Sequence, residues 1–206
     1  MPGRAQLRPA DSTPALVPRE TLERLEAFAA LVAKWTTTIN LVARGERDAI
    51  WRRHVLDSLR LIPLIPPKTD RAIDLGSGAG FPGLVLAIVT GIPFDLVEAD
   101  QRKAAFLREA QRITGAPVTV HCARIEEALL PPAPLVTARA LAPLTVLLGH
   151  TARLLRPDGM ALFPKGMRAD AEIADARTRW SVQVDRHDDP AHLGSTILAI
   201  TGLARA

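Results

Sequence analysis

Residues 72–83 read Ala72-Ile-Asp-Leu-Gly-Ser-Gly-Ala-Gly-Phe-Pro-Gly83, and this stretch decides the fold. A short apolar run ends at Asp74, glycines follow at positions 76, 78, 80 and 83, and a second apolar run begins at Leu84. Glycine is needed where φ is positive or a ligand lies close to the backbone, and Pro82 suits the first turn of a helix. The pattern predicts a strand, a tight loop and a helix, which together form a nucleotide-sized site at the carboxyl end of a parallel strand.

Two classes of cofactor fit this loop. Gly78, Gly80 and Gly83 match the G-x-G-x-x-G pattern of dinucleotide sites, which would suit NAD. The loop begins earlier, however, because Asp74 precedes Gly76 in a [D/E]-x-G-x-G-x-G pattern. A carboxylate here would repel a pyrophosphate but attract the sulfonium and ammonium groups of S-adenosylmethionine. We expect S-adenosylmethionine as the cofactor, with NAD and a purely structural turn as the alternatives.

The composition is that of a globular protein. The chain has 206 residues, of which 48% are hydrophobic and 23% charged, enough for one domain with an added segment. No apolar run nears the roughly 20 residues of a membrane span, and the proline-rich N-terminus does not resemble a signal peptide. We therefore expect a cytoplasmic protein with no membrane contact. The single cysteine, Cys122, excludes an internal disulfide and a cysteine-rich metal site, and we interpret it as a small core residue.

The net charge of +4 permits a polyanionic partner. Basic residues recur in three stretches, and any one of them could be the solvated face of a helix. Together they favour RNA or DNA as the substrate. They are Arg44, Arg47, Arg52, Arg53 and Arg60, then Arg102, Lys103, Arg108 and Arg112, and finally Lys165 and Arg168.

The chain divides into three parts by pattern. Residues 1–18 hold four prolines and predict a disordered tail. Residues 19–206 predict a single domain, with an N-terminal helical segment at 19–68 and a Rossmann-like core at 69–206. Apolar residues from Leu22 to Ile39 recur at helical spacing, and a second helix is expected from about Glu46 to Leu61, before Pro63.

The core alternates expected strands and helices, which predicts an α/β fold with a mostly parallel, doubly wound sheet. The last two strands can pair antiparallel. Strands are expected at residues 72–75, 94–98, 118–122, 135–138, 160–163, 181–185 and 195–201, and helices near 82–89, 101–113, after 124, at 144–155 and at 169–179.

Two further acidic positions suit an adenosine ligand. Glu98 ends the second strand, where a carboxylate can accept hydrogen bonds from ribose hydroxyls; an ordinary exposed acid is the alternative. Asp100 is better read as the N-cap of the next helix. Ile125 and Glu126 follow the third strand and could frame an adenine, or simply begin a helix.

The fourth strand ends near the expected methyl group, and its residues limit the reaction. The segment from Thr137 to Pro143 lacks the Asn/Asp-Pro-Pro-Tyr/Phe motif of enzymes that methylate exocyclic amines, and the chain has no tyrosine. Cys122 is poorly placed for a nucleophilic attack on cytosine. Guanine N7 carries a free lone pair and needs no general base, so positioning would suffice. Arg139 could orient the ligand or an RNA phosphate, or form a structural ion pair.

Together with these residues, several further segments make the chain resemble the RsmG (GidB) enzymes over about residues 20–200. The resemblance rests on Trp35-Thr-Thr-Thr-Ile-Asn40-Leu41, His54-Val-Leu-Asp57-Ser58-Leu59, the glycine loop, Arg139-Ala140 and Lys165-Gly166. It implies a Rossmann-like methyltransferase fold that binds S-adenosylmethionine, with Gly76, Phe81, Ile125, Glu126 and Arg139 at cofactor positions. It also implies methylation of N7 of guanine 527 in bacterial 16S rRNA, within the small ribosomal subunit.

Four other residues are candidate substrate contacts. His54, Asp57 and Ser58 share one face of a helix, so they could meet the RNA or form a buried polar network. Lys165 could contact a phosphate or solvent. No second His or Cys has metal-ligand spacing, so we expect no metal. With no long apolar seam, we expect a monomer.

Overall fold

The structure, a computed structural model, describes residues 17–43, 49–188 and 194–206. Nearly all of the predicted tail therefore lies outside the described residues. So do Arg44 and Arg47 of the first basic stretch, and the expected start of the second helix at Glu46.

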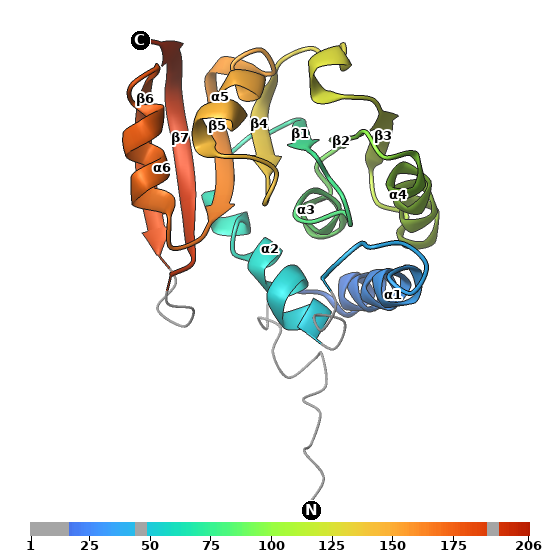
Figure 1. Ribbon diagram of the computed structural model, residues 1–206. Coiled ribbons are helices and arrows are strands. Elements are labelled where there is room, and N and C mark those ends of the chain that lie inside the picture. The colour runs from blue at the N-terminus through green and yellow to red at the C-terminus, as the bar shows by residue number, and fades with distance from the viewer. Residues whose placement is uncertain (1–16, 44–48, 189–193) are drawn as a thin grey trace, which may run out of the picture.

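A seven-stranded sheet forms the centre of the fold, in the order β3-β2-β1-β4-β5-β7-β6 (Figure 1). The pairs among β1 to β5 are parallel, and β7 runs antiparallel to both its neighbours. The predicted mostly parallel sheet with an antiparallel C-terminal strand is confirmed. The strands are β1 (Ala72–Leu75), β2 (Phe94–Glu98), β3 (Val118–Cys122), β4 (Ala133–Ala138), β5 (Leu155–Lys165), β6 (Trp180–Asp188) and β7 (Thr196–Arg205).

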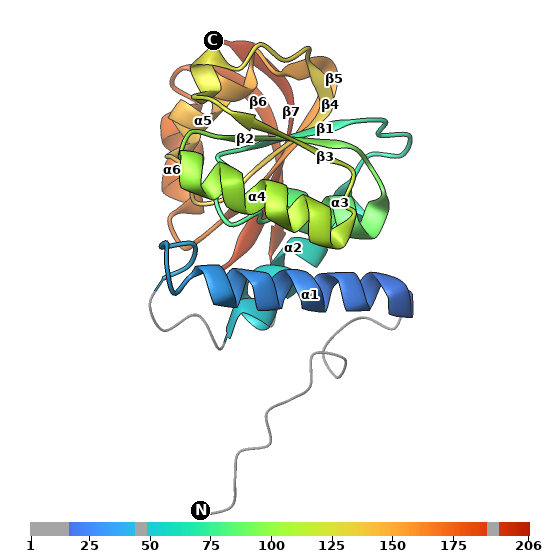
Figure 2. The same cartoon turned by 90° about the vertical axis from the view of Figure 1, so that its right-hand side faces the viewer.

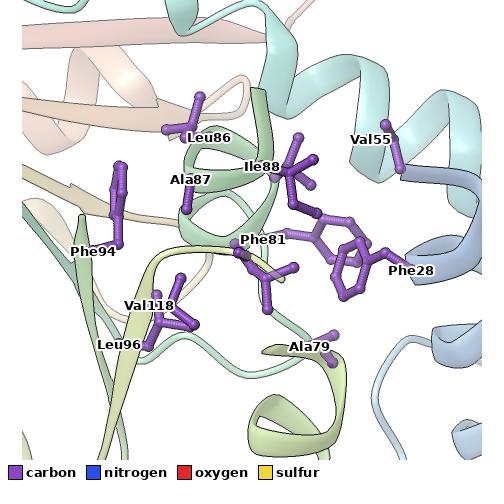
Figure 3. Packing of buried hydrophobic residues seen from close by; sticks show 14 of the residues in the cluster. Phe28, Val55, Ala79, Phe81, Leu86, Ala87, Ile88, Phe94, Leu96 and Val118 are labelled. Carbon is purple, nitrogen blue, oxygen red and sulfur yellow. The ribbon is translucent and has the colours of Figure 1, made fainter. Parts of the chain in front are cut away.

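Helices cover both faces of the sheet, so alternate strand residues enter two different cores (Figures 1 and 2). In β1, Ala72 packs into the first core and Ile73 into the second. Figure 3 shows part of the first core, where Phe28 and Phe81 lie together. The first core is built with α1 (Arg19–Trp35), α3 (Gly83–Thr90) and α4 (Gln101–Thr114), and the second with α5 (Leu144–Thr151) and α6 (Ala169–Ala176).

Helix α1 is the predicted amphipathic helix, and Leu25, Phe28 and Val32 on its inner face are completely buried. It ends at Trp35, before the buried Ile39. The hydroxyl of Thr36 competes there with backbone N–H groups for a carbonyl of the helix. Thr36 Oγ1 donates to the carbonyl of Val32 at 2.7 Å. The periodicity thus located the inner face correctly and overran the end of the helix.

The second helical segment is not a regular α-helix. It consists of a π-helix, η3 (Trp51–Leu56), followed by a short α2 (Asp57–Leu59) and a 3₁₀ turn, η4 (Ile62–Leu64). Pro63 lies in the first residues of that turn, so the regular helix stops before it, as proline requires. The wider π turn changes which side chains share a face and is frequent at functional sites.

Among the described residues, no helix is long and apolar enough to cross a membrane. The interpretation of Cys122 as a core residue is wrong, because its side chain is exposed. Cys122 is the last residue of β3, and β3 is an edge strand of the sheet. Burial of a strand end at a sheet edge depends on the neighbouring loops, which the sequence pattern does not reveal.

Candidate active site

The glycines of the loop after β1 serve three different purposes. Gly76, Gly78 and Gly80 all have positive φ, at 62°, 53° and 86°. A Cβ on Gly76 would lie 2.5 Å from Cδ1 of Leu141, so a side chain and not a ligand makes the close approach there. A Cβ on Gly80 would lie 3.1 Å from Cζ of Phe28, inside the first core. Only Gly78 has space beside its Cα, with nothing nearer than a backbone oxygen at 3.7 Å.

Asp74 is completely buried at the end of β1. Its Oδ1 accepts a 2.6 Å hydrogen bond from Oγ1 of Thr137, its partner in the register of β4. Its Oδ2 lies beside Gly83 and has no well-formed hydrogen bond among the described residues. Burial raises the pKa of Asp74 to about 6, while Thr137, Ser77, Arg139 and Gly83 oppose a further rise. The loop thus covers a buried carboxylate, one oxygen of which lacks a well-formed hydrogen bond among the described residues.

Glu98 joins the glycine loop to the loop after β2. Its Oε2 accepts from the N–H of Gly78 and its Oε1 from the N–H of Asp100, both at 2.8 Å. An ionised carboxylate has about four acceptor sites, so two remain after these bonds. Asp100 is the N-cap of α4, as predicted, because its carboxylate accepts from the N–H groups of Arg102 and Lys103.

The predicted adenine contacts lie in a 3₁₀ turn, η5 (Ile125–Glu127), directly after β3. Ile125 is half-buried against the second core. Glu126 is exposed, and its Oε1 lies 3.7 Å from Nε2 of His150. Asp74 lies near the end of β1 and Glu98 at the end of β2, and β1, β2 and β3 are adjacent parallel strands. Asp74, Glu98 and this turn therefore lie at the same carboxyl edge of the sheet.

Arg139 connects the end of β4 to the π-helix. Its guanidinium donates to Nδ1 of His54 at 2.7 Å and to the carbonyl of Arg53 at 3.2 Å, and it lies over the ring of Phe81 at 5.2 Å. A guanidinium only donates, so Nδ1 accepts and the proton of His54 is on Nε2. His54 also stacks on Phe81. Phe81 is 4% exposed, so its ring forms the buried side of this stack.

A groove of about 670 Å³ opens beside this stack, at the carboxyl ends of β4 and β5. Four cationic and two acidic side chains line it, together with small and apolar residues of the loop after β4. The charged residues are Arg53, Arg139, Lys165, Arg168, Asp57 and Glu172, and Leu141 is the residue that links the groove to Gly76.

Two predicted substrate contacts have other roles in the structure. Ser58 is 1% exposed and donates to the carbonyl of His54, so it faces the helix and not the groove. Lys165 is 10% exposed and bonds the carboxylate of Glu172 at 2.8 Å and the carbonyl of Ala142 at 3.0 Å. Asp57 lines the groove, and His54 is bonded to Arg139, another residue of the lining.

Sequence reasoning missed three residues of this site. Leu141 was not singled out, although it follows Arg139 in the same loop. Thr137 could have been found, because it is the register partner of Asp74. Glu172 gave no signal, since a lone acid near a helix start is common. In the part of the chain that the structure describes, no group of three or more acidic, His or Cys residues could hold a metal ion.

The residues present fit S-adenosylmethionine. The space beside Gly78 admits a ligand close to the backbone, and Asp74 supplies buried negative charge below the loop. Glu98 keeps acceptor sites for hydroxyl groups. A pyrophosphate over the glycine loop would lie near the carboxylate of Asp74, which disfavours NAD.

Solved structures of low sequence identity share the fold. A mutant of MtNAS in complex with S-adenosylmethionine superposes with a TM-score of 0.61 at 15% identity, covering 88% of this chain and 77% of that one. M. jannaschii TYW2 in complex with AdoMet superposes with a TM-score of 0.57 at 14% identity, covering 75% of this chain and 77% of that one. The predicted Rossmann-like methyltransferase fold is confirmed.

Sequence relatives are far more similar. A "Ribosomal RNA small subunit methyltransferase G" of Granulibacter bethesdensis is 52% identical, covering 92% of this chain and 89% of the relative. One of Acidiphilium cryptum, with the same name, is 54% identical, covering 93% and 90%. Residues 21–196 match the GidB family, described as "rRNA small subunit methyltransferase G". With such methyltransferase relatives and structural neighbours that hold S-adenosylmethionine, the predicted cofactor is also confirmed. The chain belongs to the GidB family of small-subunit rRNA methyltransferases.

Proposed function

We propose that this protein transfers a methyl group from S-adenosylmethionine to N7 of guanine 527 in 16S rRNA. The observation that supports this most directly is the junction at Leu141, where the glycine loop over Asp74 meets a basic groove. One side of the junction suits a cationic cofactor, and the other suits an anionic polymer. The names of the relatives identify small-subunit rRNA as their substrate. Guanine 527 and its N7 are what the resemblance to the RsmG enzymes implies, and an acceptor with a free lone pair suits a site that needs no general base.

The cofactor would supply a methyl group on a positively charged sulfur. Asp74 favours that charge from below the loop, and the open face of Gly78 lets the ligand approach the backbone. Glu98 accepts from ribose hydroxyls with the oxygen positions that the Gly78 and Asp100 amides leave open. Ile125 and Glu126 frame the adenine.

Guanine N7 is an acceptor that needs no catalytic base from the protein. Its lone pair is free at neutral pH, so no residue has to remove a proton before transfer. His54 is not needed as a base, and its Nδ1 already accepts from Arg139. The chain would act by holding base and methyl group in line, and such orientation effects are worth up to about 7–11 kcal/mol.

The groove would hold the RNA backbone near the acceptor. Arg53 and Arg168 are exposed cations that line the groove, and phosphate contacts by such residues make affinity fall as salt rises. We propose that residues 19–68 and 69–206 act as one domain, as a monomer in the cytoplasm, where small subunits are present. Exposed large apolar side chains of the described residues lie on separate elements, as expected for a monomer; they are Ile113, Leu129, Leu141, Val146 and Met167.

The test uses small subunits from cells that lack this protein, incubated with the protein and labelled S-adenosylmethionine. Mass mapping of nuclease fragments should place one 7-methylguanosine at position 527. A second reaction with protein-free 16S rRNA tells whether the assembled particle is required. Subunits that bind the protein but gain no label would indicate an RNA-binding module without activity, and label on another atom or nucleotide would refute the proposed acceptor.

A further inference from the structure

The loop between β4 and α5 carries both residues that border the acceptor side of the site. Arg139 lies against His54 and Phe81, and Leu141 lies against Gly76. Between them lies Ala140, whose φ is +50°. Glycine adopts such a positive φ readily, but a residue with a Cβ rarely does. A non-glycine residue in this region costs about 1–3 kcal/mol and persists only where surrounding contacts hold it.

Lys165 and Glu172 supply further contacts that hold this loop. Nζ of Lys165 donates to the carbonyl of Ala142 at 3.0 Å and to Oε2 of Glu172 at 2.8 Å. The same Oε2 accepts from the N–H of Leu144 at 2.9 Å. The pair therefore fastens the loop on both sides of Pro143, to the end of β5 and to the first turns of α6.

This pair is poorly suited to bind a phosphate. The side chains of Lys165 and Glu172 are only 10% and 20% exposed, and the ammonium is already neutralised by the carboxylate. A phosphate that approached Lys165 would also approach Glu172, which lines the same groove. Arg168 is exposed and lines the same groove, so its charge is far better placed to meet a phosphate.

We propose that Lys165 and Glu172 are positioning residues, which hold Leu141 and Arg139 so that the acceptor base meets the methyl group in line, and that neither binds RNA. This inference rests on the proposed function. Because the pair touches neither cofactor nor base, its loss should lower the rate of transfer and leave affinities unchanged. A misplacement of about 1 Å can cost roughly a hundredfold in rate, so we expect a loss of at least about tenfold.

The experiment compares Lys165→Met, Glu172→Gln and the double variant with the wild-type protein. Three quantities are measured: the single-turnover rate of methyl transfer to saturating small subunits, the affinity for S-adenosylmethionine by calorimetry, and the salt dependence of RNA affinity. Each single variant should lose about tenfold or more in rate, with both affinities within about twofold of wild type. The double variant should be no slower than the slower single variant, because the two residues act as a unit.

Arg168→Gln provides the contrasting pattern of a phosphate contact. It should weaken RNA binding and reduce the slope of log affinity against log salt by about 0.7–0.9. If Lys165→Met gives this pattern, and Glu172→Gln tightens RNA binding at an unchanged rate, Lys165 is a phosphate ligand and the inference is wrong. A wild-type protein that transfers no methyl group would instead refute the proposed function.

Leu141→Ala tests the same loop if the charge variants do not fold. Leu141 is 37% exposed, so its truncation should leave the fold intact. The expected result is again a slower transfer with unchanged affinity for S-adenosylmethionine. A wild-type rate for Leu141→Ala would overturn the inference by itself.

Discussion

The hydroxyl of Thr137 donates a 2.6 Å hydrogen bond to Oδ1 of Asp74, and both side chains are completely buried. The two residues are neighbours in the parallel register of β1 and β4. The bond ties the strand below the glycine loop to the strand that leads to Arg139, so it joins the cofactor side of the site to the acceptor side.

Thr137→Val should remove this donor while it preserves the shape of the side chain. A buried carboxylate oxygen would lose its partner, which costs about 1–3 kcal/mol. The free energy of unfolding in urea should fall by that amount, and S-adenosylmethionine should bind more weakly. Thr151→Val is the matched control, because Thr151 is equally buried but bonds only a carbonyl of its own helix. Equal losses in the two variants would argue against a special role for Thr137.

The affinity for S-adenosylmethionine should depend on pH through Asp74. Burial raises the pKa of this carboxyl to about 6, and a cationic ligand prefers the ionised form. Affinity should therefore weaken as pH falls from 7 to 5, with a midpoint at or below about 6. Calorimetry across this range, with Asp74→Asn as the control, measures the effect. A flat profile in the wild-type protein would show that the charge of Asp74 does not act on the ligand.

The stability of the ligand-free protein should show the opposite dependence. The pKa of Asp74 is higher in the folded state, at about 6, than its ordinary value of 3.8, so the folded state holds the proton more tightly. The contribution of Asp74 is fully present below pH 4 and is lost as pH rises through 6, by about 3 kcal/mol. The free energy of unfolding of Asp74→Asn is subtracted from that of the wild-type protein at each pH, and the difference gives the pH-dependent contribution of Asp74. A difference that does not change between pH 4 and 7 would contradict the raised pKa.

Glu98→Gln should loosen the glycine loop. The carboxylate accepts from the N–H groups of Gly78 and Asp100, one on each oxygen. A glutamine has one oxygen, so its NH₂ group would face one of these donors. A bond to a charged group is worth about 1.5–3 kcal/mol, which corresponds to at least about tenfold weaker binding of S-adenosylmethionine. Glu26→Gln, on the exposed face of α1, is the control and should bind as wild type does.

Sequence patterns predicted the regular part of the fold well. The bounds of β1, β2 and β3 agree with the expected strands, because each is a short run that contains β-forming residues such as Ile73, Val97 and Val118. The N-cap at Asp100 was also predictable, since capping depends on residues two and three positions away. Such local signals need no knowledge of the tertiary structure.

Contacts between distant segments were not predictable in this way. Ser58 is buried and bonded to the carbonyl of His54, and it follows a π-helix that the sequence pattern did not predict. The bond between Lys165 and Glu172 was not predictable, because Glu172 belongs to α6, whose packing against the loop after β4 is a tertiary feature. The sequence pattern predicts that the glycines of the loop surround a ligand. In the structure, Gly76 packs against Leu141 and Gly80 against Phe28, so protein contacts explain these two glycines.

The different roles of these glycines lead to a final prediction, which compares Gly78→Val with Gly80→Val. Both positions have positive φ, so each variant carries similar backbone strain. At Gly78 the new side chain enters open space beside the loop, where the cofactor is proposed to lie, so binding of S-adenosylmethionine should be lost while the protein stays folded.

At Gly80 the new side chain would meet Cζ of Phe28 at 3.1 Å and Cβ of Leu84 at 3.2 Å, so that variant should lose far more stability, as overpacked cores do. Thermal unfolding compares the stability of the two variants, and calorimetry measures the affinity of each folded variant for S-adenosylmethionine. Wild-type affinity in Gly78→Val would mean that the cofactor does not pass over this loop. Gly78 would then need its flexibility only to bring its N–H to Glu98, and the space beside its Cα would have to be explained by something other than a ligand.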